Sequence, residues 1–146
     1  MFENIFLGNS HSVSPAGVQV IQGTYDVIYA LQTGGDLVPS NQAAVVMSGV
    51  DVSANIDPLI VNVTSVRFQL IATLDTAAFP SSQYQKAVFF LRNTATGDRV
   101  DLGGSFEPLA KKFVADGTYD IVYQHVKGNL LPVNTDAVIA SGVLIG

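Results

Sequence analysis

The heptapeptide GTYDVIY, residues 23–29, recurs near the C-terminus as GTYDIVY, residues 117–123. In each copy, large apolar residues alternate with other residues, which is the period of two typical of a half-buried β-strand. The residues that share the apolar face are Tyr25, Val27 and Tyr29 in the first copy and Tyr119, Ile121 and Tyr123 in the second. We therefore predict a strand with these tyrosines in a structural core, present twice in the chain.

The similarity extends beyond the heptapeptide. Residues 23–52 align with residues 117–145, with one gap at Thr33, and 14 of the 29 pairs are identical. The identical pairs include Gly35 with Gly128, Pro39 with Pro132, Asn41 with Asn134, and Ser48-Gly49-Val50 with Ser141-Gly142-Val143. Coincidence does not explain this level of identity, so the chain contains an internal repeat.

The two copies differ in what precedes them. Upstream of the aligned part, residues 5–10 (IFLGNS) match residues 100–105 (VDLGGS) more weakly. Further upstream the second copy has strand-like residues 59–93, and the first copy has no counterpart to them. We predict a truncated β-sandwich unit at residues 1–58, lacking its opening strands, and a complete unit at residues 59–146.

Residues 59–74 form the longest apolar-alternating stretch of the sequence. Val61 and Val63 lie in one phase of the alternation. The other phase contains Val66, Phe68, Leu70, Ala72 and Leu74. The change of phase near Thr64 and Ser65 predicts a β-bulge or a strand that changes sheets.

Three further stretches support the prediction of an all-β fold. Residues 87–92 (AVFFLR) are apolar on both faces, which favours a central strand. Residues 93–100 (NTATGDRV) contain a Thr-Gly-Asp turn that leads into another short strand. Residues 75–85 hold Pro80 and two serines, and so favour a loop over a helix.

The repeated loop residues have structural roles in this reading. Pro39 and Pro132 fix φ in a loop that crosses between sheets. Asn41 and Asn134 follow two residues later and suit hydrogen bonds to the backbone of their own loop. We therefore expect the repeated motif to serve folding, with no ligand.

Composition limits the classes of function. Seven basic residues stand against 12 acidic ones, giving a net charge of −5, which argues against nucleic acid as a partner. Only 13% of residues are charged while 48% are hydrophobic, so burial of apolar surface between copies is one interpretation and a well-packed sandwich rich in Thr, Ser and Asn is the other. Without cysteine the chain has no disulfide or thiolate site. The first ten residues match neither a signal peptide nor a membrane span.

The motif, written GTYDxxY, LxP or LVPxN, and AVxxSGV, resembles β-sandwich repeats found in tandem in exported surface proteins of myxobacteria and similar bacteria. Those repeats are similar to the carboxypeptidase-regulatory-like and Cna-B-like families. The resemblance covers residues 59–146 well and residues 5–52 in part. It implies a transthyretin-type Greek-key sandwich of seven strands, in modules that serve as stalks, spacers, adhesive domains and assembly units.

A sandwich without its opening strands exposes an edge that another strand can pair with. One candidate is internal: residues 59–74 could pair with the first half through Val61 and Val63 and with the second half through Phe68 and Leu70. The other is a strand from a neighbouring copy, which would build a filament or tube. MFENIFL at the N-terminus is short and apolar, with Phe2, Ile5 and Leu7 as the candidate assembly strand. A frayed or cloned terminus is the alternative interpretation of this segment.

Residues suited to chemistry are few. The two histidines, His11 and His125, align with residues other than histidine and fit packing or surface roles. The sequence contains no nucleophile motif, and we predict no catalytic residues and no cofactor. Asp98, Asp101 and Asp116 are the candidate ligands for calcium, although surface solvation explains them equally well.

The sequence as a whole predicts a non-enzymatic structural protein. We expect it to be a subunit of an extracellular or cell-surface assembly, with itself as partner and β-strand complementation as the mechanism. The alternative function is a cell-surface binding or adhesion module for a glycan or a protein, with calcium as its one candidate cofactor.

Overall fold

The computed structural model describes residues 4–9, 12–13, 17–33, 37–56, 58–80, 82–105, 109 and 111–146. All regular structure in these residues is β-strand, and all strand pairs are antiparallel, which confirms the all-β prediction. The strands are β1 (Gly8–Asn9), β2 (Ser12–Val13), β3 (Gly23–Tyr29), β4 (Ala44–Val52), β5 (Ser65–Phe68), β6 (Lys86–Asn93), β7 (Arg99–Gly104), β8 (Lys112–Ala115), β9 (Gly117–Lys127) and β10 (Ala137–Ile145).

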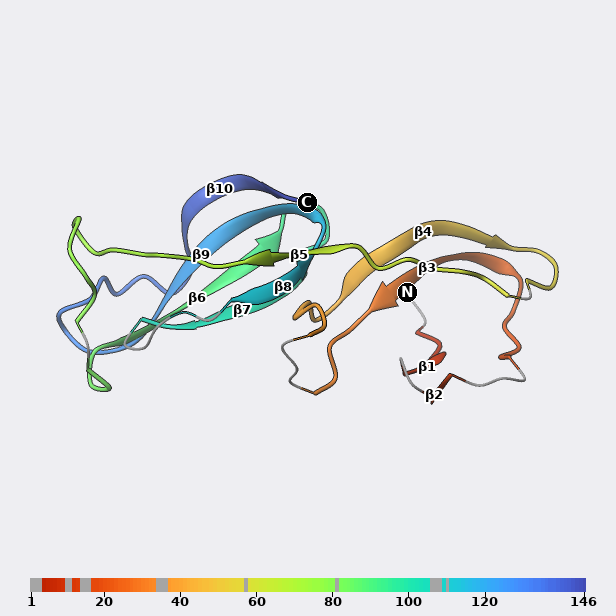
Figure 1. The fold of residues 1–146 in the computed structure, drawn as a ribbon, viewed down its shortest axis with the longest axis horizontal. Helices are drawn as coiled ribbons and strands as arrows, with labels where there is room; N and C mark the ends of the chain where they lie inside the picture. The colour runs from red at the N-terminus through yellow and green to blue at the C-terminus, as the bar shows by residue number, and fades with distance from the viewer. Residues whose placement is uncertain are drawn as a thin grey trace.

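Two sheets enclose the main core. The larger sheet has the strand order β10-β9-β6-β7, and β5 pairs with β8 in a second sheet. Figure 1 shows β5 crossing one face of the larger sheet. The buried cluster between them comprises Ala87, Phe89, Leu91, Val100, Leu102, Val114, Tyr119, Ile121, Tyr123, Leu131 and Ile145. Because Val114 lies on β8 and the others lie on or beside the larger sheet, both layers contribute to one core.

The β6 strand is the centre of the larger sheet, as its apolar sequence predicts. It pairs with β9 on one side and with β7 on the other. Phe89 and Leu91 belong to the core cluster. Phe90 is also buried, and the guanidinium carbon of Arg99 lies 3.8 Å from the centre of its ring. A strand covered on both faces requires apolar residues at successive positions.

The β3 and β4 strands form a separate two-stranded sheet, here called the N-terminal pair, which lies beside the main sheets in Figure 1. The less exposed residues of β3 are Tyr25, Val27 and Tyr29, so the predicted apolar face is confirmed. The corresponding strands β9 and β10 are here called the C-terminal pair.

The predicted long strand at residues 59–74 is only partly present. Regular pairing is limited to β5, which is antiparallel to β8. Val61, Val63 and Ser65 are half-buried in one phase, and Phe68, Leu70, Ala72 and Leu74 are half-buried in the other, so the predicted change of phase is present. Val66 pairs with Val114 of the core cluster and shares this face with Phe68, as predicted, although Val66 itself is 37% exposed.

The connections follow their turn chemistry. The side chain of Asn93 accepts hydrogen bonds from the backbone N–H groups of Ala95 and Thr96, and Gly97 has a φ of 78°. These contacts close the predicted turn between β6 and β7. Residues 75–80 and 82–85 contain no helix, as predicted.

Candidate assembly site

The loop that follows β3 joins the N-terminal pair to the main sheets. The side chain of Asn41 is completely buried and bridges three groups of the C-terminal half. Its Nδ2 atom donates to the Tyr119 hydroxyl and to Oδ2 of Asp98, both at 2.9 Å, and its Oδ1 atom accepts from the Ala115 amide at 2.8 Å. A buried side chain with every polar atom bonded fixes the relative position of the parts it connects.

Asp98 completes this contact from the other side. Its Oδ1 atom accepts hydrogen bonds from the backbone N–H groups of Gln42 at 3.2 Å and Ala43 at 2.7 Å. The carboxylate is buried, with 6% of the residue exposed. Asp98 therefore binds the loop of the N-terminal half through both of its oxygens.

The backbone of the same loop extends the smaller sheet. Pro39 forms a parallel bridge with Phe113 of β8, and the Ser40 amide donates to the Phe113 carbonyl at 2.9 Å. One strand-like segment from the N-terminal half is thus added to the edge of β8, which is a short form of β-augmentation.

The prediction for Asn41 was wrong about its partner. The sequence favoured hydrogen bonds from the side chain to its own loop, yet among the described residues the loop contact is made by the Asn41 carbonyl, which accepts from the Leu31 amide at 2.9 Å. At the repeated position the Asn134 carbonyl accepts from the His125 amide at 2.8 Å. The backbone contact is therefore repeated, and the side chain of Asn41 is left to bind the other half of the chain.

Equivalent hydrogen bonds also occur within each of the two strand pairs. The Tyr29 hydroxyl donates to the Pro39 carbonyl at 2.7 Å, and the Tyr123 hydroxyl donates to the Pro132 carbonyl at the same distance. Because the acceptor lies in the loop that each strand enters, these tyrosines hold both loops in the same way.

The bulges of β4 and β10 are also equivalent. Gly49 and Gly142 have φ values of 67° and 65°, in the left-handed region that glycine adopts without strain. Each glycine amide donates at 3.0 Å to an aspartate on the neighbouring strand, Asp26 for Gly49 and Asp120 for Gly142. The outward aspartates of the repeat thus bind a backbone amide in both copies.

The two pairs differ in how much of them is covered. Tyr119 is completely buried, whereas Tyr25 at the same place in the repeat is only half-buried. Val122 is completely buried, whereas its counterpart Ile28 is 51% exposed. The cause is β6, which pairs with β9 along its length, while among the described residues no strand pairs with the second edge of β3.

The candidate assembly strand is described only in part. Ile5 is half-buried and Leu7 is 49% exposed, and neither lies in a paired strand. Phe2 lies outside the described residues. The internal candidate is contradicted in part, because β5 pairs with β8 through Phe68, while Val61 and Val63 belong to no strand.

The three calcium candidates have different surroundings. Asp98 binds the loop of Asn41, and Asp101 forms an ion pair of 2.7 Å with Arg99. Asp116 is exposed after β8. In the described part of the chain, no group of three or more His, Cys, Asp and Glu residues is placed to hold a metal ion.

The ring of His125 makes a hydrogen bond of 2.8 Å with the Gly128 carbonyl through its Nε2 atom.

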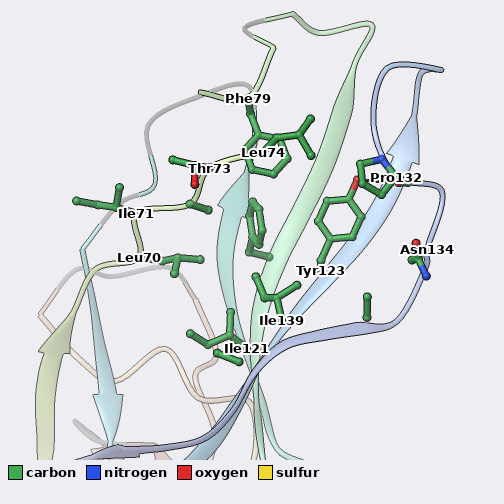
Figure 2. A pocket seen from close by; sticks show the side chains of 14 residues that line it. Leu70, Ile71, Thr73, Leu74, Phe79, Ile121, Tyr123, Pro132, Asn134 and Ile139 are labelled. Carbon is green, nitrogen blue, oxygen red and sulfur yellow. Dashed lines mark hydrogen bonds between the residues drawn. The ribbon is translucent and has the colours of Figure 1, made fainter. Parts of the chain in front are cut away.

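An apolar pocket lies at the end of the core away from the N-terminal pair. Figure 2 shows Leu70 and Leu74 on one side of it and Ile139 and Tyr123 on the other. Its volume is about 500 Å³. Because the residues around it are mainly aliphatic and aromatic, the pocket suits an apolar group.

Burial raises the pKa of three repeat tyrosines, Tyr29, Tyr119 and Tyr123, above the ordinary value of 10.0. The folded protein therefore holds these phenolic protons more tightly than the unfolded chain does. We expect stability to be unaffected by these groups below pH 10 and to fall as the pH rises through and above 10. Urea midpoints measured at pH 8 and pH 11 test this, and an equal midpoint at both would contradict it.

Comparison with known proteins gives no match to a protein-family model and no significant similarity to a curated protein or to a solved structure. Among the described residues no helix is long and apolar enough to cross a membrane.

Proposed function

We propose that the protein is a non-enzymatic structural subunit of an extracellular or cell-surface assembly, a filament or tube built from copies of itself. In this proposal residues 59–146 are a complete Greek-key sandwich of the transthyretin or Cna-B type, and residues 1–58 are a truncated one. The observation that carries the proposal is the second edge of β3, which no described strand covers, beside the half-exposed Ile28.

The repeat supplies the comparison that supports this reading. In the second half β6 covers the equivalent edge of β9, and β5 covers β8. No counterparts of β5 and β6 precede β3 in the described residues. An uncovered edge with apolar residues beside it favours pairing with an additional strand.

A strand from a second copy would complete the truncated unit by β-strand complementation. The proposed donor is MFENIFL, with Phe2, Ile5 and Leu7 as its apolar residues. Within the described part of the chain, Ile5 and Leu7 belong to no paired strand, which suits a segment that pairs with another copy.

Deletion of residues 1–8 tests the donor strand. We expect the full chain to form oligomers that grow with concentration in sedimentation velocity, and the shortened chain to form smaller ones because the complementing strand is absent. Unchanged oligomers would show that MFENIFL is not the donor.

Ile28→Lys tests the acceptor edge. A lysine on an edge strand opposes pairing, so we expect this variant to lose strand complementation while its own fold persists. Ile71→Lys is the matched control, because Ile71 is 86% exposed and lies outside the N-terminal pair. Equal oligomer size for both variants would reject β3 as the acceptor.

A second candidate function is a cell-surface binding or adhesion module, favoured by the apolar pocket between residues 70–74 and β10. An apolar side chain of a partner protein would fit its lining. If the pocket binds a partner, filling it with Ala140→Phe should weaken binding of the protein to the cell surface and leave self-association unchanged. Unchanged binding of Ala140→Phe would show that the pocket is not a binding site.

A further inference from the structure

We propose that copies join end to end through the loop of residues 130–135, which binds residues 18–25 of the next copy. This contact would reproduce, between chains, the contact that the Asn41 loop makes within the chain. The inference deepens the proposed assembly function and rests on it, but it uses a different surface from the edge of β3.

The template is the junction already present in the structure. It consists of a parallel bridge from Pro39 to Phe113, a backbone hydrogen bond from Ser40, and the buried side chain of Asn41 on Ala115 and Tyr119. These contacts place the Asn41 loop of the N-terminal pair on residues 113–119, which lead into the C-terminal pair and end at Tyr119.

The C-terminal pair carries a second loop of the same construction. Its proline and asparagine occupy the same positions, and the loop is held by the same tyrosine and backbone hydrogen bonds. In the described residues the side chain of Asn134 makes no hydrogen bond and is exposed, whereas Asn41 is completely buried. Val133 is 73% exposed, whereas Ser40 at the same position is 8% exposed. The second loop thus has the geometry of the first without a neighbour to bind.

The N-terminal pair carries the matching acceptor. In the junction the Tyr119 hydroxyl donates to the Ala115 carbonyl, and the Tyr25 hydroxyl donates in the same way to the carbonyl of Ile21. Ile21 is 79% exposed, whereas Ala115 is 4% exposed. The residues that receive Asn41 in the second half therefore have equivalents in the first half that are open to solvent.

The repeat predicts the individual hydrogen bonds of the new junction. Asn134 Oδ1 would accept from the Ile21 amide, and Asn134 Nδ2 would donate to the Tyr25 hydroxyl. The Val133 amide would donate to the carbonyl of Gln19, which aligns with Phe113. The position that aligns with Asp98 is Glu3, which lies outside the described residues, so the proposed contact does not use it.

The two surfaces lie at opposite ends of the molecule. Figure 1 shows the loop before β10 (blue) at the left end, and the segment before β3 (orange-red) at the right end. A contact between different surfaces at opposite ends is heterologous, and it adds copies in one direction without closing on itself as a two-fold dimer does. This geometry suits a filament.

Two variants test the contact from each side. Asn134→Ala removes the donor side chain, and Ile21→Pro removes the accepting site's amide N–H, which has no partner among the described residues. We expect each variant alone to associate at least about tenfold more weakly than the unchanged chain, since several hydrogen bonds are lost. Asn55→Ala, an exposed asparagine elsewhere, is the control and should assemble normally.

Mixing the two variants distinguishes an end-to-end contact from a symmetric one. Asn134→Ala keeps a working acceptor and Ile21→Pro keeps a working loop, so an equal mixture should recover one junction per pair of chains in sedimentation velocity. A mixture that recovers nothing, or an Asn134→Ala variant that assembles as well as the control, would overturn the inference. Thermal melting of each variant shows whether it is folded.

The test separates this inference from the proposed function. If the unchanged chain remains a monomer at all concentrations, both fail. If the chain assembles and Asn134→Ala has no effect while Ile28→Lys prevents assembly, strand complementation stands and the end-to-end contact is wrong.

Discussion

Replacing Asn41 with alanine should lower the free energy of unfolding by about 3 kcal/mol, because it leaves buried polar groups of the second half without partners. The Ala115 amide loses its acceptor, and Asp98 loses one of its donors in a buried position. The Tyr119 hydroxyl keeps its bond to the Ala115 carbonyl. Chemical denaturation of the whole chain measures the change.

Asn134→Ala is the matched control for this experiment. It makes the same chemical change at the same position of the repeat, where the side chain is exposed, so the free energy of unfolding should change by less than about 0.5 kcal/mol. A loss of less than about 1 kcal/mol for Asn41→Ala, or equal losses for the two variants, would contradict the assignment of Asn41 as the centre of the junction.

Leu91→Ala should also cost about 3 kcal/mol, through the loss of apolar contact and the cavity that remains. Leu91 is completely buried on the central strand, opposite Ile121 on β9 and Val100 on β7. Leu144→Ala deletes the same atoms from a side chain that is 76% exposed, and should change stability little. Similar unfolding midpoints for both variants would contradict the described core.

The local pattern of the sequence predicted correctly which faces of β3 and β6 are buried. The alternation of Tyr25, Val27 and Tyr29 predicted the face of β3, and the apolar run of residues 87–92 predicted a central strand. Both results depend on burial of one or two faces of a strand, which the spacing of apolar residues records directly.

The sequence was less informative where the partner is distant. Asn41 binds atoms 57, 74 and 78 residues away, and its own neighbours give no sign of these contacts. Asp98 was a candidate calcium ligand because the sequence shows its carboxylate but does not show its hydrogen bond to Asn41.

Asn41 and Asn134 are identical, yet a residue needed only for its own loop would be satisfied alike in both copies. The structure places one in a junction and the other on the surface. The difference between the copies, more than their similarity, indicates where a further copy of the chain would bind.

The most direct test of end-to-end assembly is a cross-link across the proposed junction. The chain has no cysteine, so Gln19→Cys with Val133→Cys introduces one thiol at each end. A short bismaleimide should produce a ladder of dimers, trimers and larger species from the double variant. Either single variant has only one thiol at each junction, so it should remain monomeric in the same reaction. A double variant that yields only monomer, at concentrations where the chain is associated, would contradict the account.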